Sequence, residues 1–120
     1  MARVLIVDGA NVVGSRPDGW WKDRAGAARR LHERLLTADL SYDEVVLVLE
    51  GAAKGGVPVG RDAHLRVVHA KGSGDDEIVR QADRPGDTAV VITADRMLQA
   101  RAASVGATSM SPSWLLDQLT

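Results

Sequence analysis

The sequence predicts a single α/β domain of three layers, with a Rossmann-like central sheet of about five mainly parallel strands. Three observations lead to this fold class. Short runs of Val, Ile and Leu continue without polar interruption, as in strands that are covered on both faces. These runs alternate with segments whose apolar residues recur at helical spacing, which is typical of helical crossovers between parallel strands. The 120 residues suit one core, so we expect a single domain over 1–120.

The first half of the chain contains two strand-like runs, one helix-like segment and one glycine-rich segment. "VLIV" at 4–7 predicts the first strand, and a polar loop with two adjacent tryptophans is expected at 14–21. The segment 22–40 predicts a helix because its apolar residues share one face. "EVVLVLE" at 44–50 predicts the second strand, and the glycine-rich segment 51–62 is expected to be a flexible loop.

The second half continues the alternation and contains residues that mark helix boundaries. Gly106 ends one helix, and Pro112 lies near the start of the last one, where its fixed φ suits a first helical turn. The predicted elements, in order, are a strand at 64–70, a helix at 74–82, a strand at 88–93, a helix at 95–106, a short strand at 107–110 and a helix at 111–119.

The composition narrows the class of protein. Hydrophobic residues make up 45% and charged residues 26%, as in an ordinary globular protein, and the absence of Phe predicts an aliphatic core. The absence of Cys excludes disulfides, thiolate zinc sites and cysteine nucleophiles, and it fits a cytoplasmic location. No apolar run has transmembrane length and no signal-peptide pattern is visible, so we expect no membrane association. A net charge of -1 argues against a strongly cationic nucleic-acid binder but allows a local basic patch.

Acidic residues follow four consecutive predicted strands. Asp8 follows the first strand, Glu50 ends the second, Asp75 and Asp76 follow the third, and Asp95 follows the fourth. The carboxyl ends of parallel strands lie at one edge of a sheet, where α/β proteins bind ligands. Carboxylates gathered there repel one another unless a cation is present. Oxygen ligands suit hard cations such as Mg²⁺, so the pattern predicts a metal site.

Each of these acids also has a purely structural explanation. Asp8, in an Asp-Gly pair, suits a turn in which its side chain bonds its own backbone. Asp75, Asp76 and Asp95 fit helix caps or the positive end of a helix dipole. Glu50 fits a solvated strand end. The metal-site hypothesis therefore depends on the coincidence of acids at all four strand exits.

Three segments of the chain resemble motifs of the NYN branch of the PIN-like nucleases. They are "VDGANVV", "KGSGDDEIV" and "ITADRMLQARAASVGA". In that family an Asp-Gly-x-Asn segment ends the first strand, a mid-chain Asp-x-x-Ile opens a helix, and a Ser/Thr-x-Asp segment ends the fourth strand. The matching residues here are Asp8 with Asn11, Asp75 with Ile78, and Thr93 with Asp95. The resemblance extends from Val4 to Leu119 and implies a PIN-like fold.

The resemblance implies a ribonuclease that uses one or two Mg²⁺ or Mn²⁺ ions, or a nuclease that acts on structured DNA. Asp8, Asp75 and Asp95 are the implied metal ligands, and Glu50 and Asp76 are further candidates. Glu50 stands where many relatives carry an Asp, and Asp76 stands where only some relatives have a second acid. The implied reaction is metal-assisted hydrolysis of a phosphodiester bond.

Two uncharged residues complete the catalytic set implied by the resemblance. Asn11 is expected to hold Asp8 or the phosphate of the substrate. Thr93 is expected to form a hydrogen bond with a carboxylate or with the attacking water. The full set is Asp8, Asn11, Asp75, Thr93 and Asp95.

The segment "GWWKDRAGAARR" combines aromatic and basic side chains, which is a pattern that can stack on bases and hold a nucleic-acid backbone. Lys71 and Arg96 lie beside the predicted acidic edge and are further candidates. The pattern equally fits a hydrophobic staple with a solvated basic face and one tryptophan packed into the domain. The candidate nucleic-acid-binding residues are Trp20, Trp21, Lys22, Arg24, Lys71 and Arg96.

Two further functional classes fit the same fold. The first is a non-catalytic module that binds nucleic acid or a protein partner, although such a module gains nothing from acids facing phosphates. The second is a phosphatase or receiver-type domain, which also places Asp at strand ends. Against the second, "VDGAN" lacks an Asp-x-Asp nucleophile pattern and no Lys follows the last strand.

Overall fold

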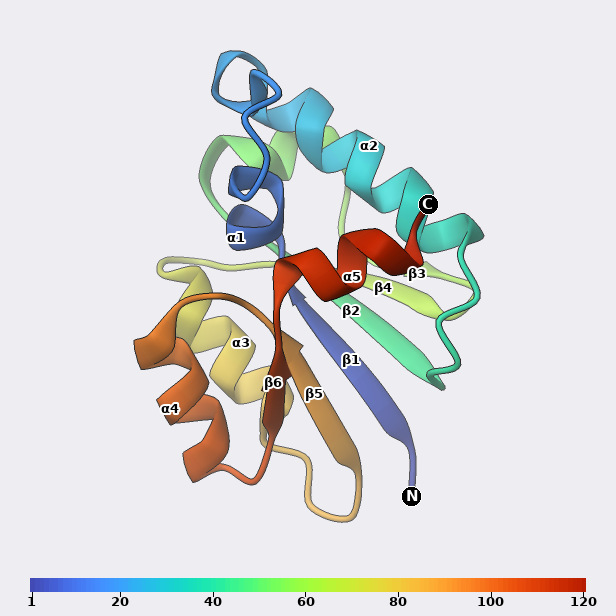
Figure 1. Ribbon diagram of the computed structural model, residues 1–120, viewed down its shortest axis with the longest axis vertical. Helices are drawn as coiled ribbons and strands as arrows, with labels where there is room; N and C mark the ends of the chain where they lie inside the picture. Colours follow the sequence, from blue (N-terminus) through green and yellow to red (C-terminus); the bar gives the residue numbers. More distant parts are fainter.

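A computed structural model describes residues 1–120 and confirms the three-layer α/β fold (Figure 1). The sheet has the strand order β3-β4-β2-β1-β5-β6, and only β3 runs antiparallel to its neighbour. Six strands replace the roughly five that the sequence predicts. Their bounds are β1 at Arg3–Asp8, β2 at Glu44–Leu49, β3 at Gly60–Asp62, β4 at Leu65–His69, β5 at Thr88–Ile92 and β6 at Thr108–Met110.

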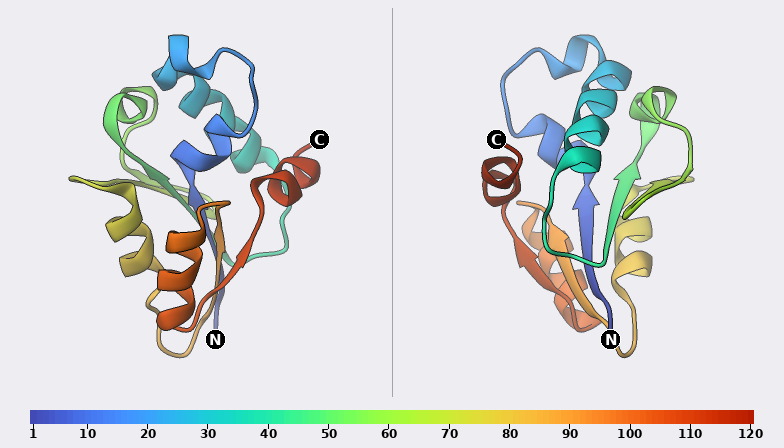
Figure 2. Two further views of the ribbon diagram at one scale, coloured as in Figure 1. Left: turned by 60° about the vertical axis from the view of Figure 1, so that its left-hand side comes forward. Right: turned by 90° about the vertical axis from the view of Figure 1, so that its right-hand side faces the viewer.

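Helices cover both faces of this sheet. Figures 1 and 2 show α1, α2 and α5 on one face and α3 with α4 on the other. None of the helices is long and apolar enough to cross a membrane. Their bounds are α1 at Gly9–Gly14, α2 at Arg24–Thr37, α3 at Gly74–Ala82, α4 at Arg96–Ser104 and α5 at Pro112–Gln118, with the 3₁₀ helices η1 at Trp20–Lys22 and η2 at Gly51–Gly56.

The central strand β1 contributes to two separate cores because its side chains alternate between the two faces. Leu5 and Val7 pack into the core beneath α1, α2 and α5, and Val4 and Ile6 pack into the core beneath α3 and α4. The same alternation assigns the next residue, Asp8, to the side of α3 and α4. The strand thus ends with a carboxylate on the side of α3, which contains Asp75 and Asp76, and of α4, which Asp95 caps.

The segment 51–62 is not the flexible loop that its glycines predict. It contains η2 and the edge strand β3. Gly56 packs so closely on the backbone of Ala25 in α2 that a β-carbon at Gly56 would collide with it. These glycines therefore allow close packing, which a single sequence cannot distinguish from flexibility.

The sequence also does not predict α1. Asp8 was expected to lead into a turn, but it caps a helix of six residues. A β-carbon on Gly9 would lie 2.6 Å from the carbonyl oxygen of Val48, so only glycine allows α1 to start this close to β2. A helix this short has too few apolar residues to show a helical period.

Candidate active site at the carboxyl edge of the sheet

The predicted acids surround the point where the strand order reverses. From β1 the chain first builds β2 and β4 on one side, and it then crosses over to build β5 on the other side. In the β1–β5 pair, Val7 faces Ile92, so Asp8 and Thr93 follow at adjacent strand exits. Open α/β sheets bind their ligands at such a switch point, outside the carboxyl ends of the strands.

Asp8 is the most buried of the candidate acids, with 6% of its surface exposed. Its Oδ1 accepts a hydrogen bond of 3.3 Å from the backbone N–H of Asn11, which caps α1. Its Oδ2 accepts a hydrogen bond of 3.0 Å from the hydroxyl of Thr93. Asp8 is thus the N-cap of α1 and not the turn residue of the structural explanation, and the cap uses only one of its two oxygens.

Thr93 connects the acids of two strand exits. It is fully buried, and its hydroxyl both donates to Asp8 and accepts a hydrogen bond of 3.1 Å from the backbone N–H of Asp95. The carbonyl oxygen of Thr93 accepts a hydrogen bond of 2.9 Å from the side chain of Gln99 in α4. The structure thus brings Asp8, Thr93 and Asp95 together, as the predicted catalytic set requires.

Asn11 and Asp95 hold the loop between β5 and α4. The side-chain oxygen of Asn11 accepts a hydrogen bond of 2.8 Å from the backbone N–H of Ala94. Oδ1 of Asp95 accepts hydrogen bonds from the backbone N–H groups of Met97 and Leu98, which caps α4. The side-chain NH₂ of Asn11 and Oδ2 of Asp95 form no hydrogen bond within the protein, so both remain available to a ligand.

Two acids at this edge, Asp8 and Asp75, have raised pKa values. Burial raises the pKa of Asp8 above its usual 3.8, in opposition to the hydrogen bonds from Thr93 and Asn11, and the charges of Asp75 and Glu50 raise it further. Burial also raises the pKa of Asp75, together with the charges of Asp95 and Glu50, and Arg101 only partly offsets this effect. The edge therefore carries negative charge that the protein does not balance.

Glu50 and Asp76 differ in how their charges are held. Oε2 of Glu50 accepts a hydrogen bond of 3.0 Å from the backbone N–H of Gly74, and a β-carbon on Gly74 would lie 3.1 Å from this carboxyl group. Glu50 is thereby fixed at the edge. Asp76 has 68% of its side chain exposed and pairs with Arg101 at 2.8 Å, so its charge is largely balanced, although it still raises the pKa of Asp75.

The donor set at this edge fits a hard divalent cation. No group of three His, Asp or Glu side chains is placed to hold a metal ion in this arrangement. Mg²⁺ needs only one or two carboxylates, with water and substrate phosphate as its other ligands. The buried and unbalanced charge of Asp8 is the observation that fits a bound cation.

A cleft of about 390 Å³ begins beside the acidic edge, and we call it the Trp20 cleft. The residues that line it include Gly9 and Glu50 from the acidic edge together with Trp20 and Arg24. The guanidinium of Arg24 stacks on the ring of Trp20 at 4.9 Å. Trp21 meets Trp20 edge to face at 5.9 Å, but it is 52% exposed and does not line the cleft.

The remaining basic candidates lie on the surface. The side chains of Lys22, Lys71 and Arg96 are exposed and form no ion pair. The sequence prediction missed two contacts at this site. The contact of Gln99 with Thr93 could have been anticipated, because Gln99 lies four residues after Asp95 in a predicted helix. The bond from Gly74 to Glu50 could not, because 24 residues separate the two.

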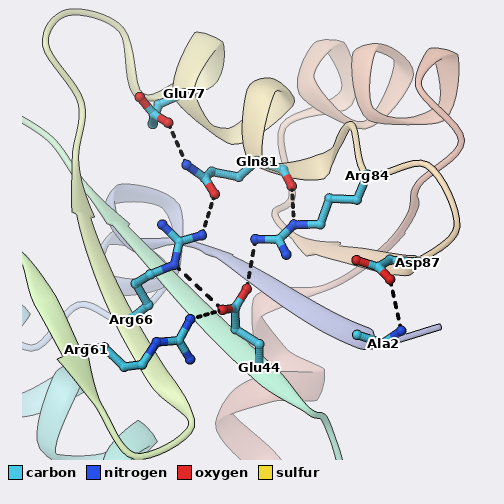
Figure 3. Close-up of polar contacts among 8 residues, drawn as sticks. All are labelled: Ala2, Glu44, Arg61, Arg66, Glu77, Gln81, Arg84 and Asp87. Atoms are coloured by element: carbon cyan, nitrogen blue, oxygen red, sulfur yellow. Dashed lines mark hydrogen bonds and ion pairs between the residues drawn. The ribbon is translucent and has the colours of Figure 1, made fainter.

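A second charged cluster lies at the opposite end of the sheet, at the start of β2 (Figure 3). The carboxylate of Glu44 forms ion pairs with Arg61, with Arg84 at 2.8 Å and with Arg66 at 3.7 Å. Burial alone would raise the pKa of Glu44, but the hydrogen bond from Arg61 and the charges of Arg84 and Arg66 outweigh it and lower the pKa. At this end of the sheet, three arginines therefore balance the charge of an acidic side chain.

Comparison with known proteins identifies relatives by structure and not by sequence. No protein-family profile matches the chain, and no curated protein matches it. The crystal structure of Rae1 (YacP) from Bacillus subtilis is similar, with a TM-score of 0.78 and 22% identity over 97% of this chain and 72% of that one. A mutant of the same protein gives a TM-score of 0.75 and 19% identity over 98% and 74% of the two chains. At these identities the likeness establishes the fold, and this chain has the fold of Rae1 (YacP) over nearly its whole length.

Proposed function

We propose that this protein is a ribonuclease of the NYN branch of the PIN-like nucleases and that it hydrolyses phosphodiester bonds with Mg²⁺ or Mn²⁺. The observation that carries this proposal is the buried and unbalanced carboxylate of Asp8, bonded to Thr93 at the switch point of the sheet. The matching motifs and the fold shared with Rae1 (YacP) support the family assignment.

Within this proposal, Asp8, Asp75 and Asp95 hold the cation, and Glu50 adds negative charge from the side. When bound, the ion polarises the phosphate, lowers the pKa of a bound water and stabilises the leaving oxygen. We leave Asp76 out of the ligand set because Arg101 already balances its charge.

The uncharged residues position the acids and the substrate. The hydroxyl of Thr93 holds one oxygen of Asp8, and the backbone N–H of Asn11 holds the other, so the carboxylate has one defined orientation. The side-chain oxygen of Asn11 is also occupied, by the backbone N–H of Ala94. Its NH₂ group is left to donate to a phosphate oxygen of the substrate.

The Trp20 cleft supports RNA as the substrate. Single-stranded nucleic acids bind where aromatic rings stack on bases beside basic side chains, and this cleft offers Trp20 and Arg24 next to the acids. We expect Trp20→Ala to weaken binding of single-stranded RNA by about 1–3 kcal/mol. Trp21→Ala is the matched control and should leave affinity nearly unchanged, because Trp21 does not line the cleft. If Trp20→Ala and Trp21→Ala lower stability equally and neither changes the affinity for RNA, the RNA binds outside this cleft.

A cleavage assay tests the proposed activity. The protein should cleave single-stranded or loop RNA in Mg²⁺ or Mn²⁺, and EDTA should stop the reaction. Asp8→Asn and Asp95→Asn should abolish most of the activity, since both residues are proposed to hold the cation. Equal cleavage by the wild-type protein and both variants would show that a contaminating nuclease is responsible.

A non-catalytic RNA-binding module is the alternative, and one observation favours it: no three acids are placed to hold a metal ion. This alternative predicts that the protein binds RNA equally well in EDTA and in Mn²⁺, with no cleavage in either. The nuclease proposal predicts cleavage that depends on Asp8.

A further inference from the structure

A second pocket, of about 130 Å³, lies on the face of the molecule covered by α1, α2 and α5 (Figure 1), and we call it the arginine pocket. Arg16 follows α1, and Arg30 with Arg34 belongs to α2, yet all three line this one pocket. The pocket adjoins the Trp20 cleft, because Val13 of α1 lines both. Arg30 belongs to the segment "GWWKDRAGAARR", whose pattern of aromatic and basic residues can hold a nucleic-acid backbone, whereas Arg16 and Arg34 lie outside it.

No acid is paired with any of these three arginines. None of their side chains forms an ion pair or a hydrogen bond within the protein. The pocket contains one acid, Asp18, and it lies within ion-pair distance of none of them. By contrast, every arginine around Glu44 is paired. The arginine pocket therefore carries a net positive charge, on three exposed residues, that no ion pair within the protein balances.

The local arrangement favours an anion in this pocket. Arg30 and Arg34 are four residues apart on one helix face, where like charges repel one another. Val12, Leu31 and Leu116 provide an apolar wall, which strengthens charge interactions at its surface. A volume of about 130 Å³ corresponds to roughly four waters at about 30 Å³ each, which is room for one tetrahedral anion.

We propose that the arginine pocket is a phosphate-binding site. Guanidinium groups match phosphate oxygens in charge and in geometry, and they donate paired hydrogen bonds to them. The phosphate belongs either to an RNA strand that continues past the Trp20 cleft or to a free phosphate compound. The first source rests on the proposed ribonuclease function, and the second does not.

The first arm of the test uses inorganic phosphate in the presence of EDTA, which removes divalent ions from the acidic edge. Thermal melts compare phosphate with chloride at equal ionic strength. Phosphate should raise the melting temperature of the wild-type protein, and Arg30→Gln should remove most of that rise. Arg29→Gln is the matched control, because Arg29 is exposed on the same helix but does not line the pocket. The control should respond to phosphate like the wild-type protein.

The second arm measures the Kd of a fluorescein-labelled single-stranded RNA in EDTA over a range of salt concentrations. Arg30→Gln should weaken binding roughly threefold to tenfold and lower the slope of log Kd against log salt by about 0.7, the value for one lost contact to a phosphate of a single strand. Arg34→Gln and Arg16→Gln should behave in the same way, whereas Arg29→Gln should keep the wild-type slope.

The two arms separate the sources of the phosphate. If Arg30→Gln weakens only the binding of RNA, the pocket binds the RNA backbone. If it weakens only the binding of inorganic phosphate, the pocket binds a free phosphate compound. Either result supports the site even if the protein cleaves no RNA, because neither arm requires cleavage. If Arg30→Gln and Arg29→Gln have equal effects in both arms, or no effect in either, the proposal is wrong.

Discussion

Glu44 and Asp8 lie on neighbouring strands at opposite ends of the sheet, and their surroundings differ completely. Glu44 begins β2 and is paired with three arginines, which lower its pKa. Asp8 ends β1, has no basic partner, and has a raised pKa because of burial and because Asp75 and Glu50 lie nearby. Both carboxylates are largely removed from water, but only one of them is balanced by the protein itself.

Under the proposed function, this difference distinguishes a structural acid, Glu44, from a functional one, Asp8. An ion-paired carboxylate such as Glu44 is complete without a ligand, and it links three elements at the amino end of the sheet. A buried carboxylate with acids nearby and no basic partner destabilises the ligand-free protein when it is ionised, and carboxylates with perturbed pKa values often lie at functional sites. The contrast predicts effects of opposite sign when each acid is neutralised.

The largest expected effect is the loss of RNA cleavage when Asp8 is changed to Asn. Outer contacts of a metal site are worth about 10–100-fold in activity, so the loss of a ligand should cost at least about 100-fold. Asn keeps the shape of the side chain and can still accept the bond from the backbone of Asn11, so far-UV circular dichroism should show an intact fold. Cleavage at the wild-type rate by a folded, purified variant would place the chemistry elsewhere.

Thr93→Val should have the next largest effect. Valine keeps the shape of the side chain but removes the hydroxyl that joins Asp8 to the backbone of Asp95. We expect cleavage to fall by about 10–100-fold, as for other contacts that orient a ligand. Thr93→Ser retains the hydroxyl and should restore most of the rate. If the serine variant is as slow as the valine variant, packing by the methyl group matters and the hydroxyl does not.

Glu44→Gln should destabilise the fold and leave cleavage unchanged. The change leaves Arg61, Arg66 and Arg84 without their partner, and we expect a loss of about 1–3 kcal/mol in the free energy of unfolding near neutral pH. The folded pKa of Glu44 lies below its usual 4.5, so its contribution is full above that value and disappears as pH falls through the folded pKa. Urea unfolding of both proteins should therefore give curves that differ near neutral pH and converge in acid.

Asp75→Asn should give a smaller effect of the opposite sign. The folded pKa of Asp75 lies above its usual 3.8, so its ionised form costs stability that appears as pH rises through the folded pKa. In EDTA near neutral pH the variant should melt at a slightly higher temperature than the wild-type protein. Addition of Mn²⁺ should raise the melting temperature of the variant less than that of the wild-type protein. If Asp75 acts only through the helix dipole of α3, the variant should instead melt at the same temperature or lower, with a normal response to Mn²⁺.

The alternation of strands and helices could be predicted from the sequence, and so could the position of the acids at one edge of the sheet. The bounds of α3 and the parallel strands followed from apolar patterns that are strong over short distances. The sequence did not predict η2 or β3, because glycine permits close packing and flexibility equally well, and it did not predict α1, because a helix of six residues is too short to show a helical period. It also could not show that Asp76 is paired with Arg101, because that contact depends on how α3 and α4 pack.

The distinction between Trp20 and Trp21 likewise needed the structure. The two are adjacent and chemically identical, so no pattern separates them. Only the packing of η1 beside α1 shows that Trp20 lines a cleft while Trp21 remains exposed.

Binding of Mn²⁺, followed by the electron paramagnetic resonance signal of the free ion, tests the central claim most directly. The wild-type protein should bind Mn²⁺, Glu44→Gln should bind it equally well, and Asp8→Asn should weaken binding by roughly tenfold or more. This pattern would show that the unbalanced acids at the carboxyl edge hold a cation and that the paired acid at the other end does not. Equal binding by wild-type protein and Asp8→Asn, or no binding by the wild-type protein, would contradict the account.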